Sequence, residues 1–253
     1  MRDTLRIGRF VEAGSWAHRL DPRSKLTAMF LYLAAVLFID SWYGLAALSV
    51  VSFAGLLSTR IPLSKYLKTL KPLRFLIAFV FAVPLLFEQD GFLHGSVAAG
   101  RMIWFVSFTA TLTFTTETPR LVLGMESMLR PMRRLGWNPD RWTFMLAVAL
   151  RFIPSIMEEA DIVLKAQASR GVDFRELPWK SKAKALVTLL IPIASGAFRR
   201  ASELIDAYAS RGYRPGMERT RYEVLAWGRA DTWFLLGFAG AMAAVVWTNA
   251  WAG

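Results

Sequence analysis

Charged residues divide the chain into long apolar runs and basic connecting segments. Five apolar runs, of which only the fourth contains a charged residue, Arg101 near its start, are candidates for membrane-spanning helices, because a helix needs ~20 apolar residues to cross the hydrocarbon core. They cover Leu26–Ile39, Tyr43–Leu57, Phe75–Phe87, Val97–Thr116 and Thr232–Gly253. The first two runs are separated by a short turn that begins at Asp40, which predicts a helical hairpin. The pattern therefore predicts an all-α integral membrane protein with about five transmembrane helices.

The region between the fourth and fifth runs contains few Gly and Pro residues and predicts three further helices. We expect them over about Pro119–Arg134, Arg141–Arg170 and Trp179–Arg211, the last two being long and crossing. Each long helix has an apolar first half, Trp142–Leu150 or Ala185–Phe198, which is too short to span a bilayer.

A helix that is apolar on most sides for half its length needs lipid, a partner helix or another protein. We expect a partner-binding surface, with candidate contact residues Phe144, Met145, Val148, Leu189 and Ile193. The alternative is that the two long helices simply cover each other.

The distribution of basic residues predicts the topology. Every Lys and Arg except Arg101 lies in one of three segments, 1–25, 58–74 and 117–230. An excess of Lys and Arg marks cytoplasmic segments, so we expect a multi-pass membrane protein with a cytoplasmic N-terminus and an external C-terminus. The charged start of the chain predicts no cleavable signal peptide. The predicted divisions are a cytoplasmic segment (1–25), a four-helix membrane region (26–116), a cytoplasmic helical region (117–230) and a last membrane helix (231–253).

The amino-acid composition limits the classes of function that the chain can have. Hydrophobic residues make up 55% of the 253 residues and charged residues 20%, with a formal net charge of +12. This composition excludes intrinsic disorder and suits a membrane protein better than a nucleic-acid binder. The chain has no Cys and two His residues, which argues against thiol catalysis and a His-rich metal centre. The acidic cluster Glu158, Glu159 and Asp161 more simply forms a solvated or salt-bridged face, with Asp161 paired to Lys165 at i,i+4.

A repeated tetrapeptide ends both long helices. Ala168-Ser169-Arg170-Gly171 recurs as Ala209-Ser210-Arg211-Gly212. One reading is helix capping, in which Gly takes the left-handed conformation at C′ and Arg favours the negative helix end. The other reading is recognition, because small neighbours leave an Arg free to enter a pocket on another protein and form a forked hydrogen-bonded contact.

These features resemble the transmembrane coupling (T) subunit of energy-coupling factor transporters, over about residues 15–222. The resemblance is carried by the paired tetrapeptides and by four other stretches, Leu20–Leu26, Leu129–Gly136, Ala149–Pro154 and Arg211–Tyr213. It implies a subunit of a prokaryotic plasma membrane, without ATPase activity or cofactor. It further implies that Arg170 and Arg211 dock into two cytoplasmic ABC ATPase subunits, which bind ATP and Mg²⁺. The apolar helix faces would carry a small membrane protein, the S subunit, which captures a vitamin or a metal ion.

Two other functions remain to be weighed. A conventional importer permease with its own substrate path needs polar or ionisable groups within its spans, and here the five apolar runs contain almost none. A membrane enzyme needs clustered His, Asp or Glu residues on one membrane face, and we identify no such cluster in the sequence. The sequence contains no G-x-x-x-x-G-K-[ST] nucleotide-binding loop. It does not name the transported substrate, because in this family the substrate contacts lie in the S subunit.

Overall fold

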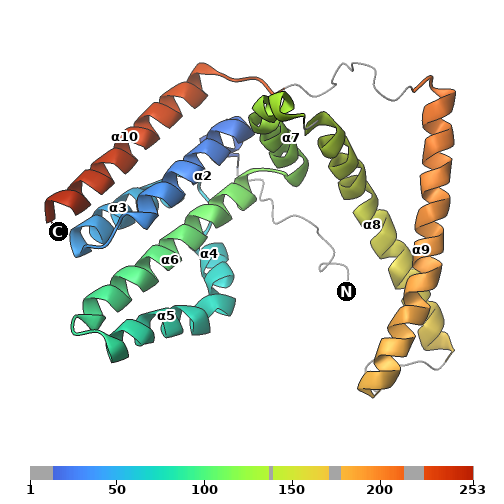
Figure 1. Cartoon of the computed structure of the whole chain (residues 1–253), viewed down its shortest axis with the longest axis horizontal. Coiled ribbons are helices and arrows are strands. Elements are labelled where there is room, and N and C mark those ends of the chain that lie inside the picture. The colour runs from blue at the N-terminus through green and yellow to red at the C-terminus, as the bar shows by residue number, and fades with distance from the viewer. Residues whose placement is uncertain (1–13, 137–138, 171–177, 214–224, 253) are drawn as a thin grey trace. The chain divides into compact units, whose positions relative to one another are not determined.

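The computed structural model describes residues 14–136, 139–170, 178–213 and 225–252, and every regular element in this part of the chain is a helix (Figure 1). The all-α fold class is therefore confirmed. The helices are α1 (Trp16–Arg19), α2 (Pro22–Leu37), α3 (Trp42–Ser58), α4 (Leu63–Leu70), η2 (Lys71–Leu73), α5 (Arg74–Phe87), α6 (Gly91–Thr115), α7 (Thr118–Leu129), η3 (Arg130–Leu135), α8 (Pro139–Ser169), α9 (Trp179–Ser210) and α10 (Arg229–Ala252).

The chain forms two compact units. One unit, here called the helix pair, contains α9 and the part of α8 from Phe144 onward. The other unit, here called the bundle, contains α1 to α7 and α10. The bundle is discontinuous in sequence, because the helix pair is inserted between α7 and α10. This division rests on contacts within the chain and does not show where a membrane lies. The four predicted segments, 1–25, 26–116, 117–230 and 231–253, therefore stay a prediction.

Apart from one or two residues at their ends, the described parts of the five apolar runs lie within helices, namely α2, α3, α5, α6 and α10. Three helical segments of the described chain are long and apolar enough to cross a membrane: Leu63–Phe87, Gly91–Thr115 and Arg229–Trp251. The first of these is longer than the predicted run Phe75–Phe87, because α4, η2 and α5 follow one another without a break. Helix α3 is apolar but shorter. A membrane protein is thus supported, while the count of five spans remains a prediction.

The core of the bundle lies between α2, α3, α6 and α10. Tyr32 of α2 is almost fully buried, stacks on Phe108 of α6 with ring centroids 4.2 Å apart, and shares a 2.6 Å hydrogen bond with Ser52 of α3. Val97 and Val245 bring α6 and α10 into the same cluster. Between helices in a membrane such contacts stabilise through van der Waals packing and interhelical hydrogen bonds, so this cluster holds together helices that lie far apart in the sequence.

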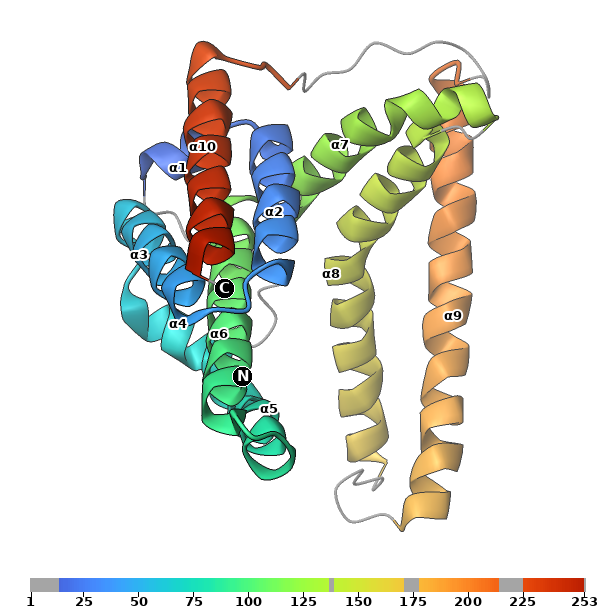
Figure 2. The same ribbon diagram turned by 60° about the vertical axis from the view of Figure 1, so that its left-hand side comes forward.

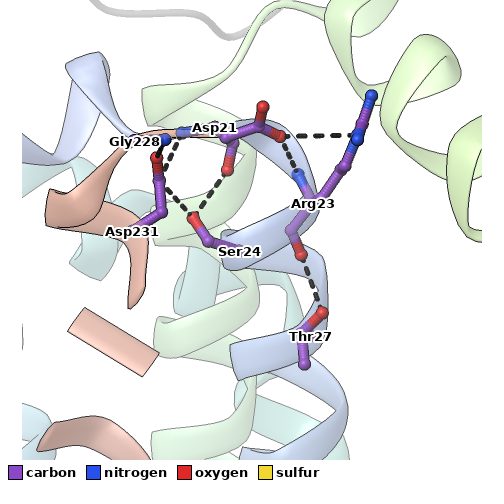
Figure 3. A network of polar contacts seen from close by, with 6 residues as sticks. All are labelled: Asp21, Arg23, Ser24, Thr27, Gly228 and Asp231. Carbon is purple, nitrogen blue, oxygen red and sulfur yellow. Dashed lines mark hydrogen bonds and ion pairs between the residues drawn. The ribbon is translucent and has the colours of Figure 1, made fainter. Parts of the chain in front are cut away.

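A polar network, here called the polar junction, joins the start of α2 to the start of α10 (Figure 3). The buried Asp231 carboxylate accepts hydrogen bonds from the Asp21 backbone N–H at 2.8 Å, the Ser24 hydroxyl at 2.9 Å and the Gly228 N–H at 2.9 Å. Asp21 in turn caps α2 by accepting from the Arg23 N–H at 2.8 Å, with Pro22 at the first helical position. Asp21-Pro22 is therefore the start of α2.

Lys25 connects the same end of α2 to the end of α6. Its ammonium group donates to the Thr115 carbonyl oxygen at 3.1 Å and to the Thr116 hydroxyl at 2.9 Å. The residue is 8% exposed and lies just before the predicted span Leu26–Ile39. Burial lowers the pKa of Lys25 from 10.5 to about 8, and the positive charge of Arg120 acts in the same direction.

The opposite end of the bundle is held by Asn249, near the end of α10. Its side-chain oxygen accepts from the Asp40 N–H at 3.0 Å, the Ser41 N–H at 2.9 Å and the Ser41 hydroxyl at 2.8 Å. Its amide nitrogen donates to the Phe38 carbonyl oxygen at 2.8 Å. Arg101, the basic residue outside the three basic segments, pairs with Asp40 at 3.2 Å. Asn249 therefore satisfies most of the polar groups in the turn between α2 and α3.

Candidate functional site

Helices α8 and α9 cross each other in Figure 1 and run in opposite directions (Figure 2). Three contacts define their register: Phe144 meets Tyr208, Ser155 meets Arg200, and Glu159 lies against Gly196. Residue numbers rise along α8 as they fall along α9, so the pair is antiparallel. The predicted helices Arg141–Arg170 and Trp179–Arg211 are confirmed to within two residues at each end.

An ion pair at the middle of the helix pair fixes this register. One guanidinium nitrogen of Arg200 donates to the Ser155 hydroxyl at 2.5 Å, and another lies 3.1 Å from a Glu159 carboxylate oxygen. Gly196 is buried against the same carboxylate, and a Cβ atom at this position would overlap it. The acidic cluster is thus partly salt-bridged as expected, but through Glu159 across the two helices. The predicted pair of Asp161 with Lys165 is wrong, because no ion pair joins these two described residues and both are exposed.

The first tetrapeptide ends α8. The last residue of α8 is Ser169, and the Arg170 backbone N–H donates to the Gln167 carbonyl oxygen at 3.0 Å. Ala168, Ser169 and Arg170 are all exposed. Gly171 lies outside the described residues, so its predicted capping conformation stays a prediction.

The second tetrapeptide forms a complete Schellman cap. Gly212 has φ +76, its N–H donates to Ala209 at 3.0 Å, and the Tyr213 N–H donates to Tyr208 at 2.9 Å. These are the 5→2 and 6→1 bonds of that motif, so the capping reading is confirmed for Gly212. The cap uses only backbone groups. The cap therefore gives no role to the side chains of Ala209, Ser210 and Arg211, all three of which are exposed.

An aromatic cluster anchors the second tetrapeptide to the start of the helix pair. The rings of Phe144, Tyr208 and Tyr213 lie 5.4–6.3 Å apart between centroids. Sequence reasoning placed Phe144 on a partner-facing surface and did not identify the two tyrosines. A signal for them exists, because an apolar contact between the C″ and C3 positions accompanies Schellman caps, and Tyr213 and Tyr208 occupy those positions.

The two motif arginines lie at opposite ends of the helix pair. Each follows the C-terminus of its helix, and the two helices are antiparallel. At ~1.5 Å per residue, helices of this length separate the arginines by about 45 Å. Within the described part of the chain, neither guanidinium group forms a hydrogen bond or ion pair. Two unengaged cations are therefore presented at two separate places.

Apolar side chains remain exposed along both helices after they pair. The alternative in which α8 and α9 fully cover each other is therefore not what the structure has. The exposed residues are Met145, Leu146, Met157, Ile162 and Leu164 on α8 and Val187, Leu190, Ile191, Phe198 and Ile205 on α9. Many exposed apolar side chains on one pair of helices indicate a contact with protein or lipid.

The candidate contact residues on this surface differ in exposure. Met145 is 56% exposed, Phe144, Val148 and Ile193 are half-buried, and Leu189 is only 8% exposed. Met145 is therefore free to meet another molecule, whereas Leu189 lies inside the helix pair.

Comparisons with known proteins give a consistent result. The model of the CbiQ family, described as cobalt transport protein, matches residues 13–222. A protein of Bacillus subtilis (strain 168) named "Energy-coupling factor transporter transmembrane protein EcfT" is 36% identical, over 92% of this chain and 93% of its own length. A Listeria innocua protein of the same name is 32% identical over 98% of this chain and 99% of its own length. The similarity thus covers the bundle and the helix pair together.

Proposed function

The chain belongs to the family of energy-coupling factor transporter transmembrane proteins, and from that membership we propose that it is the non-catalytic coupling subunit of an importer. It joins two cytoplasmic ABC ATPase subunits to one S subunit, a small membrane protein that captures a vitamin or metal ion. The ATPases, and not this chain, bind ATP and Mg²⁺. The N-terminus and the helix pair are cytoplasmic and the C-terminus is external, as the distribution of basic residues predicts.

The observation that carries this proposal is the pair of exposed arginines at opposite ends of one antiparallel helix pair. A separation of about 45 Å places the two residues too far apart to share one binding pocket. It suits two separate ATPase subunits, each of which receives one arginine. The guanidinium group forms planar, forked hydrogen bonds with carboxylates or carbonyl oxygens, and the small residues before each arginine leave room for the walls of a pocket.

Coupling follows from the stiffness of the helices between the two arginines. When ATP draws the ATPases together, each subunit pulls on one end of the helix pair. The Arg200–Glu159 pair and the close contact at Gly196 hold the crossing point, so displaced ends move the exposed apolar surface. An S subunit seated on Met145 and its exposed neighbours would then be moved in the membrane.

Co-purification and uptake test the proposal. A tagged chain is expressed with the two ATPases and the S subunit from the same genome, as wild type and as Arg170→Ala, Arg211→Ala and the double variant. Truncating one partner of a buried charged pair costs ~2–5 kcal/mol, or at least about 30-fold in affinity. Each single variant should therefore lose much of its ATPase, and the double variant should lose uptake.

Two controls separate docking from helix capping. Arg199→Ala removes an exposed α9 arginine outside both tetrapeptides and should leave ATPase binding unchanged. Lys at position 170 or 211 should restore little binding, because an ammonium group lacks the planar fork, whereas simple capping would accept Lys with a change of only ~0.3–1 kcal/mol. Full uptake by the double Ala variant would refute the docking role. Uptake that needs the ATPases but no S subunit would identify a conventional permease instead.

A further inference from the structure

A cavity of about 410 Å³ lies within the bundle and is lined by residues of α1, α2, α3, α6 and α10. Its walls are mostly apolar and include Ala28, Val51, Phe108 and Phe238, while Lys25 lies at one end. The volume is within the range of ~300–1,000 Å³ that small-molecule sites occupy. Nothing in the coupling proposal uses this cavity, which belongs entirely to the bundle and not to the helix pair.

The cavity opens sideways between α3 and α10. Gly55 of α3 and Gly237 of α10 line it, and both residues are exposed. A Cβ atom built at either glycine would meet no other atom within 4 Å, so both border empty space. Helix α10 is a candidate membrane span and α3 is an apolar helix, so the outer faces of these helices meet lipid. The opening therefore leads to the bilayer.

The end of the cavity at Lys25 carries a buried cation with spare hydrogen-bonding capacity. An ammonium group has three N–H donors, and the structure pairs that of Lys25 with Thr115 and Thr116. A buried cation is stabilised only when its donors find acceptors. Lys25 lies where α2 begins and α6 ends, which is the level of the lipid headgroups for helices that cross a bilayer. Tyr32, which also lines the cavity, lies roughly 10 Å further along α2.

We propose that one acyl chain of a membrane phospholipid enters this cavity between Gly55 and Gly237, with the lipid phosphate beside Lys25. A phospholipid combines the three features that the cavity requires. Its acyl chain fits apolar walls, its phosphate oxygens accept hydrogen bonds from an ammonium group, and it is already present on the side where the cavity opens. The lipid would fill the space between α3 and α10 and support the packing of the bundle.

The test counts phospholipid molecules retained by the purified full-length protein, using native mass spectrometry after a graded detergent wash. Gly55→Leu and Gly237→Leu each add a side chain at the rim of the cavity and should each lower phospholipid retention by about tenfold, because the added side chain displaces part of the acyl chain from its packing contacts. Gly240→Leu is the matched control. Gly240 lies one turn beyond Gly237, also has no atom within 4 Å of its Cβ position, and does not line the cavity. Leu favours helix over Gly at all three positions, so these variants should keep the fold.

Lys25→Gln tests the phosphate contact separately and should also release the lipid, since Gln keeps a donor but loses the charge. Equal retention by wild type, Gly237→Leu and Gly240→Leu would overturn the acyl-chain assignment. Unchanged retention by Lys25→Gln would overturn the phosphate assignment. Both readouts concern bound lipid and not uptake, so their failure would leave the coupling proposal standing.

Discussion

The polar junction provides a quantitative test of how the bundle is held together. Asp231→Ala removes a carboxylate that is 4% exposed and accepts three hydrogen bonds. The loss is unequal among the donors. Asp21 is buried, so its N–H would be stranded at a cost of ~1–3 kcal/mol. Ser24 keeps a second acceptor, the Asp21 carbonyl oxygen at 2.8 Å. Gly228 is exposed, so water replaces the lost acceptor.

These terms sum to a cost of about 3 kcal/mol for Asp231→Ala, because the lost bonds are to a charged group and one donor is stranded. Asp231→Asn retains one oxygen, which can still accept from Asp21 and Ser24, and places its amide group toward the exposed Gly228 N–H. That variant should cost only about 1 kcal/mol. For a domain of 150–250 residues, about 2–4 °C corresponds to each kcal/mol. We therefore expect Tm to fall by ~6–12 °C for Ala and by ~2–4 °C for Asn.

The assay is thermal unfolding of the purified protein in one detergent, followed by loss of the monodisperse peak on size exclusion. Asp90→Ala is the control, since Asp90 is exposed and its side chain caps nothing. Equal unfolding temperatures for the Ala and Asn variants would refute the assigned role of Asp231, because the neutral amide should recover most of the stability. Unfolding of both variants at the temperature of the control would show that the carboxylate does not hold α2 to α10.

Four further predictions concern the helix pair, the pH response and the topology. Met145→Glu should release the S subunit while the ATPases still co-purify, because a charge in a desolvated interface is costly; loss of both partners would mean that the helix pair had collapsed. Arg200→Ala should lower the ATPase-coupled uptake rate without releasing the ATPases, because Glu159 and Ser155 lose the contact that fixes the helix crossing; an unchanged rate would contradict this. Between pH 8 and 10.5 the unfolded chain binds more protons than the folded chain at Lys25, whose pKa burial lowers from 10.5 to about 8. Stability should therefore rise with pH across that window, and Lys25→Gln should lack this component of the rise when the two melting curves are compared. A reporter fused after Gly253 should be external and one inserted at Thr59 internal, and an internal C-terminus would contradict the five-span topology.

Local signals in the sequence were sufficient for much of the fold. The ends of α8 and α9 follow from Pro, Gly and the shift between apolar and charged residues, and Gly212 adopts the left-handed conformation expected of it. Charged residues in the connecting segments also indicate where the apolar helices of the bundle begin and end. These features depend on neighbours within a few residues, which is why the sequence alone predicts them.

Contacts between distant segments could not be predicted in the same way. Nothing near Asp21 indicates that its partner is Asp231, and nothing near Asp40 indicates Asn249. The candidate contact residues show the same limit, because the apolar first half of each long helix indicated a contact surface but could not separate exposed Met145 from buried Leu189. Which side of an apolar helix is covered depends on the partner helix and its register, and that information is not local.

The discontinuity of the bundle has a consequence for the order in which the chain is made. Helices α2 and α3 leave the ribosome early, yet the Asn249 side chain that satisfies their turn comes 208 and 209 residues later. At ~5–20 residues per second, the hairpin waits at least about ten seconds for its partner. During that interval the whole helix pair is synthesised while the bundle lacks α10. Truncation within α10 should therefore expose an incomplete bundle to quality-control proteases, even though most of the chain has been made.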